Sequence, residues 1–377
     1  MNVNSKTQLI IDASEREPDL LWASGFLAVD AFTWLRDSRG SAIMLTDLEF
    51  GRGEKEAKVD EVISYSAMDA KARGEEVGPV PFEEVVLTLL RTREVTEVEV
   101  PARFPLQVAD HLRAGGVTVS SCRDPFFPER AIKRADEIAC IEQSQAATEA
   151  AMEMAVDAVR RSEPDQDGLL QLEGEPLTSE RLKGMVRFFL LERGFQIGPF
   201  IIAPGDQGCD PHDVGSGPLH AGETIIIDIY PQHMTHRYWG DMTRTVVRGR
   251  ATEDQKRIHA AVQEAQETAI DLIRPGASGD AIHRRVQDIF EKAGFPTEKR
   301  DGTWVGFFHG TGHGLGLDIH EPPRINRNGP VLEEGIAVTV EPGLYYPGIG
   351  GCRIEDVVIV TADGCQNLNK AAKDLEV

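Results

Sequence analysis

The residues that could do chemistry lie in the second half of the chain, where five side chains able to bind a metal ion occur. They are Asp228, Asp241, His313, Glu341 and Glu355. Two of these carboxylates end apolar runs, because Asp228 follows residues 224–227 and Glu341 follows residues 336–340. A buried carboxylate without a partner is strongly destabilising. Five such groups on one chain therefore predict that they share cations.

The composition of this set indicates which metals it would bind. Carboxylates with one imidazole favour manganese, cobalt, iron or zinc over metals that require thiolates. Two metals about 3.5–4 Å apart need carboxylates that bridge them, and neighbouring strands of a hairpin bring side chains close enough to do so. Such a pair lowers the pKa of a bridging water and polarises a carbonyl. The pattern therefore predicts a hydrolytic centre with two divalent metal ions.

The same part of the chain holds four further candidates for catalysis or substrate binding, His212, His309, His320 and Arg353. Residues 308–316 place four glycines around two histidines, which predicts a tight loop, since glycine permits close backbone approach. Arg353 lies two residues before Glu355. On a strand both side chains would point the same way, so Arg353 could hold Glu355 or a substrate carboxylate.

The elements that must position these residues read as mixed α/β. In the first 120 or so residues we expect strands at 41–45, 95–100 and 117–119 and a helix at 105–115. Residues 123–128 carry two prolines around a polar break and are expected as a linker. The expected domains are therefore 1–124 and 125–377. A long helix is expected from about 131 to 161.

An internal repeat organises the expected second domain. Two further helices are expected in it, one after the capping box at 252–255 and one from Ser278 to Gly294. Gly222 lies six residues before Asp228, and Gly335 lies six before Glu341. Each half thus offers two helices and then a β-hairpin with one acid on each arm. Two such halves facing each other would bring four acids to one point near a pseudo-twofold axis.

Composition excludes several classes of function. The chain has 377 residues, 41% of them hydrophobic and 27% charged, with a formal net charge of −22. That charge argues against nucleic acid and against an acidic membrane surface as partners. No run approaches the roughly 18 apolar residues of a membrane span, and the first residues lack the pattern of a signal peptide. Five cysteines without a CxxC spacing are expected as reduced thiols in the cytoplasm.

Five segments together resemble a known family, the pita-bread metallopeptidases, which include methionine aminopeptidase, aminopeptidase P, prolidase and the metal-free creatinase. The segments are 227–230, 240–245, 309–316, 340–343 and 352–356. The resemblance covers about residues 125–370 and implies a pita-bread catalytic domain with an internal pseudo-twofold repeat. The first 124 residues resemble only in kind the creatinase/prolidase-type α/β domain. The presence of that domain argues against methionine aminopeptidase.

The resemblance implies a role for each metal ligand. Asp241 and Glu355 would bridge both metals, and Asp228 would bind one of them. His313 and Glu341 would bind the other metal. Glu341 would also accept a proton from the bridging water.

The resemblance implies roles for the other candidates too. His309 and His320 would contact the substrate and stabilise the charge that develops at the scissile carbonyl. His212 would line the pocket and help move a proton to the leaving proline nitrogen. Arg353 would order the site.

The expected function is hydrolysis of the Xaa-Pro bond, in dipeptides or at peptide N-termini, by a metal-bridging hydroxide. Two divalent metal ions are the expected cofactors, with manganese first and cobalt, zinc or iron as alternatives. The expected partner is a small peptide substrate containing proline, and the resemblance implies a homodimer. A cytoplasmic location is expected.

Two other functions stay open from the sequence. The stretch between Asp228 and Asp241 is about two residues longer than in the best-known members, and this difference keeps open the alternative of a lyase or hydrolase acting on a small non-peptide molecule such as dimethylsulfoniopropionate. A binding module that keeps the fold without catalysis is the other alternative, and the complete set of ligands argues against it.

Overall fold

The computed structural model describes residues 6–75 and 78–377. The expectation that the first residues lack a signal peptide rests largely on residues 1–5, which lie outside the described ranges. The chain divides into two compact units, Met1–Arg130 and Ala131–Val377, and each is described by itself. Within the described ranges, no helix combines the length and the apolar character that crossing a membrane requires.

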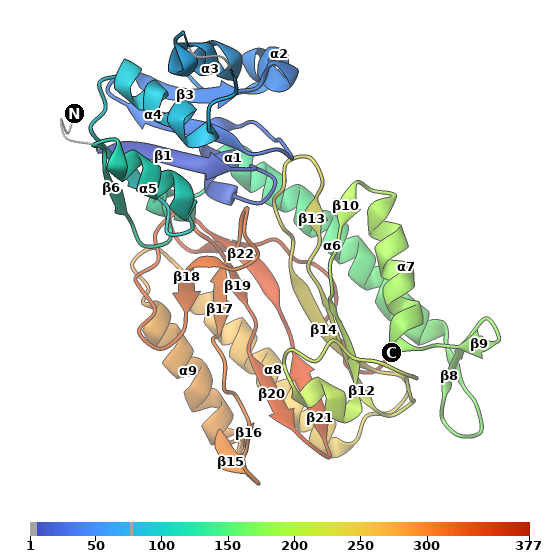
Figure 1. Ribbon diagram of the computed structural model, residues 1–377. Coiled ribbons are helices and arrows are strands. Elements are labelled where there is room, and N and C mark those ends of the chain that lie inside the picture. The colour runs from blue at the N-terminus through green and yellow to red at the C-terminus, as the bar shows by residue number, and fades with distance from the viewer. Residues whose placement is uncertain (1–5, 76–77) are drawn as a thin grey trace. The chain divides into compact units, whose positions relative to one another are not determined.

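The first unit is a six-stranded sheet with helices packed on it (Figure 1, blue to teal). The strand order is β4-β3-β2-β1-β5-β6. Its strands are β1 (Thr7–Asp12), β2 (Phe32–Asp37), β3 (Gly40–Leu45), β4 (Glu61–Ser64), β5 (Glu97–Val100) and β6 (Thr118–Ser121). Its helices are α1 (Pro18–Ser24), α2 (Asp47–Glu56), α3 (Tyr65–Arg73), α4 (Phe82–Thr92) and α5 (Leu106–Ala114). Successive residues of β1 enter different apolar clusters, so both faces of the sheet are covered.

The segment expected as a linker belongs in part to the core of the first unit. Phe127 is 1% exposed, and its ring lies 5.6 Å from that of Trp34 and 4.9 Å from that of Phe126, measured between centroids. The division between the units falls after Arg130, whose guanidinium forms a buried ion pair with Asp19 at 2.7 Å.

The second unit contains two similar halves, each with two helices followed by strands that lead to the acids (Figure 1, green to red). The four helices are α6 (Ala135–Arg161), α7 (Ser179–Leu191), α8 (Glu253–Leu272) and α9 (Gly279–Lys292). The first half forms the sheet β11-β12-β14, and the second forms the sheet β18-β17-β19-β22-β23 and the hairpin β20-β21. Helices α6 and α7 share a core with β12 and β14, and α8 and α9 share one with β18 to β22.

The longer strands of this unit are β11 (Ile201–Pro204), β12 (Thr224–Ile229), β14 (Met242–Val247), β17 (Gly312–Gly314), β18 (Glu321–Ile325), β19 (Ala337–Val340), β20 (Gly343–Tyr346), β21 (Gly350–Arg353), β22 (Asp356–Val360) and β23 (Cys365–Asn367). Short strands are β7 (Glu163–Pro164), β8 (Leu170–Leu172), β9 (Glu175–Pro176), β10 (Phe195–Gln196), β13 (Gln232–His233), β15 (Glu298–Arg300) and β16 (Thr303–Val305). There are also two short 3-10 helices. Helix η1 (Pro128–Ala131) spans the division between the units, and η2 (Gly205–Cys209) follows β11.

The repeat read from the sequence reappears in the backbone. Gly194 and Gly294 follow α7 and α9 at φ of 81° and 85°, a left-handed conformation that favours glycine. Strand β12 pairs antiparallel with β14, and β19 pairs antiparallel with β22. In each half one acid lies at the end of the first strand of the pair, and the other lies directly before the second strand. This arrangement carries four acids to one region.

Helix α6 holds one of these acids through a buried polar face. Gln145 is 1% exposed, and its side-chain amide donates to the carbonyl of Asp241 at 2.8 Å and accepts from the Asp241 N–H at 3.0 Å. Ser144 donates to the carbonyl of Tyr238 at 2.9 Å. A side chain at Gly240 would lie 2.7 Å from the Ser144 carbonyl oxygen, so the segment needs glycine there. The backbone around Asp241 is thus fixed to the helix.

The hydrogen bonds of Gln145 predict that its substitution affects both the stability of the fold and the binding of metal. Gln145→Leu would leave the buried N–H and C=O of Asp241 without partners, and we expect it to lower the free energy of unfolding by roughly 2–4 kcal/mol. We also expect weaker binding of divalent metal in a titration. Gln143→Leu, at an exposed position on the same helix, is the control and should change neither quantity. Equal behaviour of the two variants would contradict the role of Gln145.

Candidate metal centre

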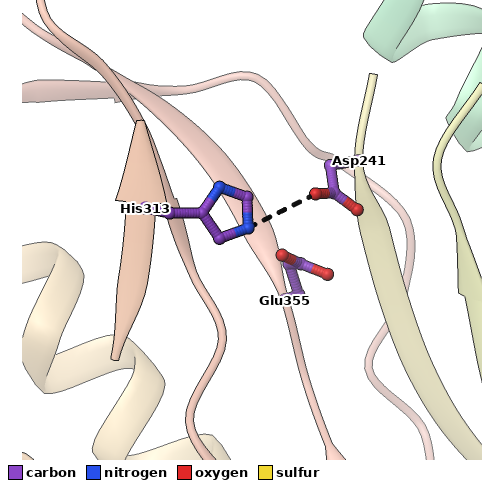
Figure 2. A group of neighbouring side chains, drawn as sticks. All are labelled: Asp241, His313 and Glu355. Atoms are coloured by element: carbon purple, nitrogen blue, oxygen red, sulfur yellow. Dashed lines mark ion pairs between the residues drawn. The ribbon is translucent and has the colours of Figure 1, made fainter. Parts of the chain in front are cut away.

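Three of the expected ligands form a tight buried group, Asp241, His313 and Glu355 (Figure 2). One ligand atom from each lies within 4.8 Å of the others. His313 lies on β17, whereas Asp241 and Glu355 directly precede β14 and β22. The imidazole Nε2 of His313 is 3.7 Å from Asp241 Oδ2. Segments from both halves therefore meet at this group.

The hydrogen bonds of His313 determine which ring nitrogen can bind a metal. Nδ1 lies 3.1 Å from the Gly314 carbonyl oxygen, which can only accept, so Nδ1 carries the proton. The lone pair of Nε2 is then free on the side of the acids, where Glu341 Oε1 lies 3.6 Å away. Burial lowers the pKa of His313 to about 3. The imidazole is neutral, which is the form that binds metal ions.

The glycine-rich loop around His313 packs too tightly for other residues. A Cβ atom at Gly312 would lie 1.9 Å from the carbonyl oxygen of Thr339, and one at Gly314 would lie 2.4 Å from that of Pro322. The Glu341 N–H donates to the Thr311 carbonyl in the same loop at 2.8 Å. The loop thus fixes Glu341 as well as His313, and its close packing explains the glycines at positions 312 and 314.

Asp228 carries an oxygen that lacks a protein partner. Its Oδ2 accepts a hydrogen bond from Arg353 Nη2 at 2.7 Å. Its Oδ1 is buried and has no hydrogen bond from any residue in the described ranges. A buried carboxylate oxygen without a partner is rare in native structures. A cation at this point would supply the missing interaction.

The charges of the site lead to the same conclusion. Burial raises the pKa of Asp241 and of Glu355 well above the ordinary values, and the neighbouring carboxylates raise both further. Burial also raises the pKa of Glu341 to about 7. Carboxylates this close cannot all be ionised without protons or cations among them. The oxygen-rich donors with one neutral imidazole therefore fit divalent metal ions.

Arg353 connects Asp228 to His309 through a chain of hydrogen bonds. Its Nη1 donates to the hydroxyl of Tyr345 at 2.9 Å, and that hydroxyl lies 2.9 Å from Nε2 of His309. Nδ1 of His309 lies 2.8 Å from the Gly310 carbonyl and must donate to it. Nε2 of the neutral ring therefore accepts from the tyrosine. Burial lowers the pKa of His309 to about 3, so this neutral form is the stable one.

Two further residues hold the acids in place without being metal ligands. Thr243 donates its hydroxyl to Glu355 Oε2 at 2.7 Å. The buried Arg244 donates to the carbonyls of Thr243 and Glu355 at 2.9 and 2.8 Å and to the carboxylate of Asp356 at 2.8 Å. These bonds join β14 of the first half to the segment before β22 of the second half.

All nine expected site residues line one pocket of about 640 Å³, a volume typical of sites for small ligands. They differ in exposure. Asp228, Arg353 and the three residues of the tight group are buried. Glu341 is intermediate in exposure, and His212 and His320 are exposed. The ring of His320 lies edge-on to that of His313 at 4.4 Å between centroids. The structure thus brings together every side chain that the sequence nominated.

The sequence analysis missed several residues of the pocket and its support. Arg324 lines the pocket and is exposed, and its guanidinium forms no ion pair with a described residue. Tyr230 and Phe308 also line it, whereas Tyr345 and Thr243 hold the residues that do. Only Arg324 had a local signal, since it follows His320 by four residues in the same motif. The others come close only through the fold.

Residues 139–362, more than half of the chain, match the model of metallopeptidase family M24. The chain belongs to this family. Membership of a metallopeptidase family implies divalent metal ions, and the donors described above fit them. The family resemblance drawn from the sequence is confirmed.

Relatives and solved structures agree with this assignment. The chain is 31% identical over 250 residues to the Xaa-Pro dipeptidase of Pyrococcus furiosus, an alignment that spans 65% of each protein. It is 37% identical over 179 residues to the probable dipeptidase PepE of Mycobacterium tuberculosis, covering 47% of this chain and 45% of that protein. The curated relatives are thus matched over less than two thirds of their length.

Structural similarity extends over nearly the whole chain. The Xaa-Pro dipeptidase from Bacillus anthracis superposes with a TM-score of 0.81 at 24% identity, covering 99% of this chain and 95% of that chain. The X-Pro aminopeptidase from Thermotoga maritima superposes with a TM-score of 0.80 at 22% identity, covering 98% and 97%. The expected fold, a creatinase-type domain followed by a pita-bread domain, is confirmed.

The raised pKa of Glu341 predicts how pH affects the metal-free protein. Between the ordinary value of 4.5 and about 7 the folded state keeps a proton that the unfolded chain has released. Stability therefore falls as pH rises through this range. Between pH 4.5 and 8 we expect the free energy of unfolding of the metal-free protein to fall by up to about 3 kcal/mol relative to that of Glu341→Gln. This figure follows from about 1.4 kcal/mol per unit of pKa shift.

Denaturant unfolding of chelated samples across this pH range measures the effect. The exposed Glu334→Gln is the control and should follow the wild type. A constant difference between wild type and Glu341→Gln at all pH values would show that Glu341 does not hold the proton.

Proposed function

We propose that this protein hydrolyses the peptide bond before proline in Xaa-Pro dipeptides. The observation that carries the proposal is the pocket itself, in which buried carboxylates and a neutral imidazole, suited to divalent metals, lie beside Arg324. Among the residues that the structure describes, Arg324 has no ion-pair partner. The names of the relatives, Xaa-Pro dipeptidase and probable dipeptidase, support the same substrate class. They also favour a peptide over the small zwitterion of a lyase.

Arg324 supports a dipeptide as the substrate. A guanidinium on the pocket wall can pair with the carboxylate of a C-terminal proline through two hydrogen bonds. In a dipeptide this carboxylate lies one residue from the scissile bond, so it stays inside a pocket of this size. A longer peptide would place an amide there instead and would leave Arg324 without an anion.

Divalent metals held by Asp228, Asp241, His313, Glu341 and Glu355 would activate a water and polarise the scissile carbonyl. Among the residues of the chain, Glu341 would accept the proton, because its carboxylate lines the pocket and lies 3.6 Å from the neutral imidazole of His313. His212, exposed on the pocket wall, can carry a proton to the leaving nitrogen of proline. Arg353 keeps Asp228 oriented through its 2.7 Å hydrogen bond.

We assign stabilisation of the developing oxyanion to His320 rather than to His309. Nδ1 of His309 donates to a backbone carbonyl and Nε2 accepts from Tyr345, so neither nitrogen offers a proton to a substrate. The ring of His320 is exposed beside His313 and can donate. His309 would then act on the substrate through packing, and on Arg353 through Tyr345.

Three finer features belong to the same proposal. Manganese is the expected metal, with cobalt, zinc or iron as alternatives, because the oxygen-rich donors suit these ions. The five cysteines form no disulfide within residues 78–377, which supports a cytoplasmic location. The expected homodimer rests on the sequence resemblance. The expected domain limits 1–124 and 125–377 rest on the prolines of residues 123–128, and the division into compact units falls six residues later, after Arg130.

Removal and restoration of the metal test the proposed reaction. We expect exhaustive chelation to abolish hydrolysis of Ala-Pro, because no metal ion would then activate the water or polarise the scissile carbonyl. Addition of manganese or cobalt should restore hydrolysis, with metal content measured in the same samples. Activity that survives chelation would overturn the mechanism. Acrylate release from dimethylsulfoniopropionate with no turnover of any Xaa-Pro peptide would favour the lyase.

Substitution of Arg324 tests the substrate class. We expect Arg324→Met to raise the KM for Ala-Pro on the order of ten-fold, about 1.4 kcal/mol, because the substrate carboxylate loses its partner. The KM for Ala-Pro amide, which lacks that carboxylate, should change little. Arg327→Met, at an exposed position that does not line the pocket, is the control. An equal loss for both substrates would show that Arg324 does not bind the carboxylate.

A further inference from the structure

The turn that carries His320 has little structure of its own. Residues 316–320 lie between β17 and β18 and are neither helical nor extended. Within the turn, the Gly316 N–H donates to the Asp318 carbonyl at 3.1 Å, and the Asp318 N–H lies 3.4 Å from the Glu321 carboxylate. Ile319 and His320 both line the pocket. An imidazole on such a turn needs external support to keep one orientation.

A buried ion pair supplies support at the end of the turn. Lys133 Nζ lies 2.7 Å from Glu321 Oε1, and the side chains are only 2% and 6% exposed. Lys133 also donates to the Ala131 carbonyl at 3.1 Å. Gly316 approaches the same carboxylate so closely that a Cβ there would lie 2.7 Å from Glu321 Oε1. The residue directly after His320 is therefore anchored to the segment before α6.

Trp239 supplies support at the start of the turn. Its backbone N–H donates to the Gly316 carbonyl at 3.0 Å, and its indole Nε1 donates to the Leu317 carbonyl at 3.0 Å. Trp239 belongs to the loop between Asp228 and Asp241, the stretch that kept the lyase alternative open in the sequence analysis. The long loop of the first half thus reaches the turn of the second half.

The loop that carries Trp239 is itself held firmly. Tyr238, directly before it, donates its hydroxyl to Glu137 on α6 at 2.7 Å and accepts from Ser144 on its carbonyl. The rings of His233 and His236 stack at 3.8 Å between centroids and are half-buried. Their Nδ1 atoms accept backbone N–H groups within the loop. The loop is therefore hydrogen-bonded to α6 through Tyr238 and to the turn through Trp239.

We propose that Trp239 and Lys133 are positioning residues, which hold the turn at residues 316–321 so that His320 faces the substrate carbonyl. The inference rests on the proposed function for the role of His320, and it assigns the longer loop of the first half to the support of that residue. The loop therefore serves the peptidase reaction instead of marking a different substrate.

A double-mutant cycle with His320→Ala tests the positioning role. Trp239→Phe keeps the ring and the backbone N–H but removes the indole donor, and Lys133→Met removes the ion pair. We expect each to lower kcat/KM for Ala-Pro about ten-fold with unchanged metal content. In the His320→Ala background each should change it less than two-fold, because coupled residues are not additive. The same loss in both backgrounds, or loss of metal, would overturn the proposal.

Control variants and a second measurement keep the test decisive. Trp304→Phe and Lys256→Met alter exposed residues of the same types and should leave kcat/KM unchanged. The double variant Lys133→Met with Glu321→Gln removes the ion pair without leaving a buried charge unpaired. It therefore tests the same role if Lys133→Met alone does not fold, and it should give the same loss of kcat/KM. Hydrogen exchange needs no substrate, and we expect amides of residues 316–321 to exchange at least ten-fold faster in Trp239→Phe. Unchanged exchange would overturn the support role even if no Xaa-Pro peptide were cleaved.

Discussion

The second unit depends on holding several buried carboxylates around one point. Asp241 and Glu355 are almost fully buried, and Glu341 lies beside the same imidazole. Like charges at such distances repel strongly in a region of low dielectric constant. Only protons or cations relieve that repulsion. A site of this kind is costly when empty and ionised, and the same energy favours the binding of divalent metal.

The surrounding structure answers that constraint by fixing backbone atoms as well as side chains. Gln145 binds both backbone groups of Asp241, and Arg244 binds the carbonyls of Thr243 and Glu355. Repelling carboxylates would separate if their strands could move. Hydrogen bonds that join the two halves at their backbones prevent this, and they keep the donors close enough for shared ions.

The sequence predicted the site better than the elements that support it. Carboxylates in apolar strands and histidines among glycines are local signals, and all nine nominated side chains line one pocket. Helix α6 shows the limit of such signals. Its apolar periodicity correctly predicts a helix. The structure also buries Ser144, Gln145 and Thr148, because these side chains pack against the polar backbone of residues 238–241. A polar face that packs on backbone resembles a solvated face until the fold is known. The sequence also predicts a linker at Phe126 and Phe127. The tryptophans that pack on Phe127 lie about 90 or more residues earlier in the chain, so no local pattern shows that this segment is buried.

The two halves are alike in the acids they supply and differ in what surrounds the substrate. His309, His320, Arg324 and Arg353 all come from the second half, whereas His212 is the one nominated histidine from the first. The first half contributes the long loop and the polar face of α6, which fix the backbone of Asp241 and the turn before His320. A repeat can retain a symmetric ligand set while its halves diverge, because the metals constrain only the ligands. In this protein the first half supplies the support together with His212, and the second half supplies the other nominated histidines and both arginines of the pocket. It is consistent with this freedom that the loop between Asp228 and Asp241 in the first half contacts the turn of the second half.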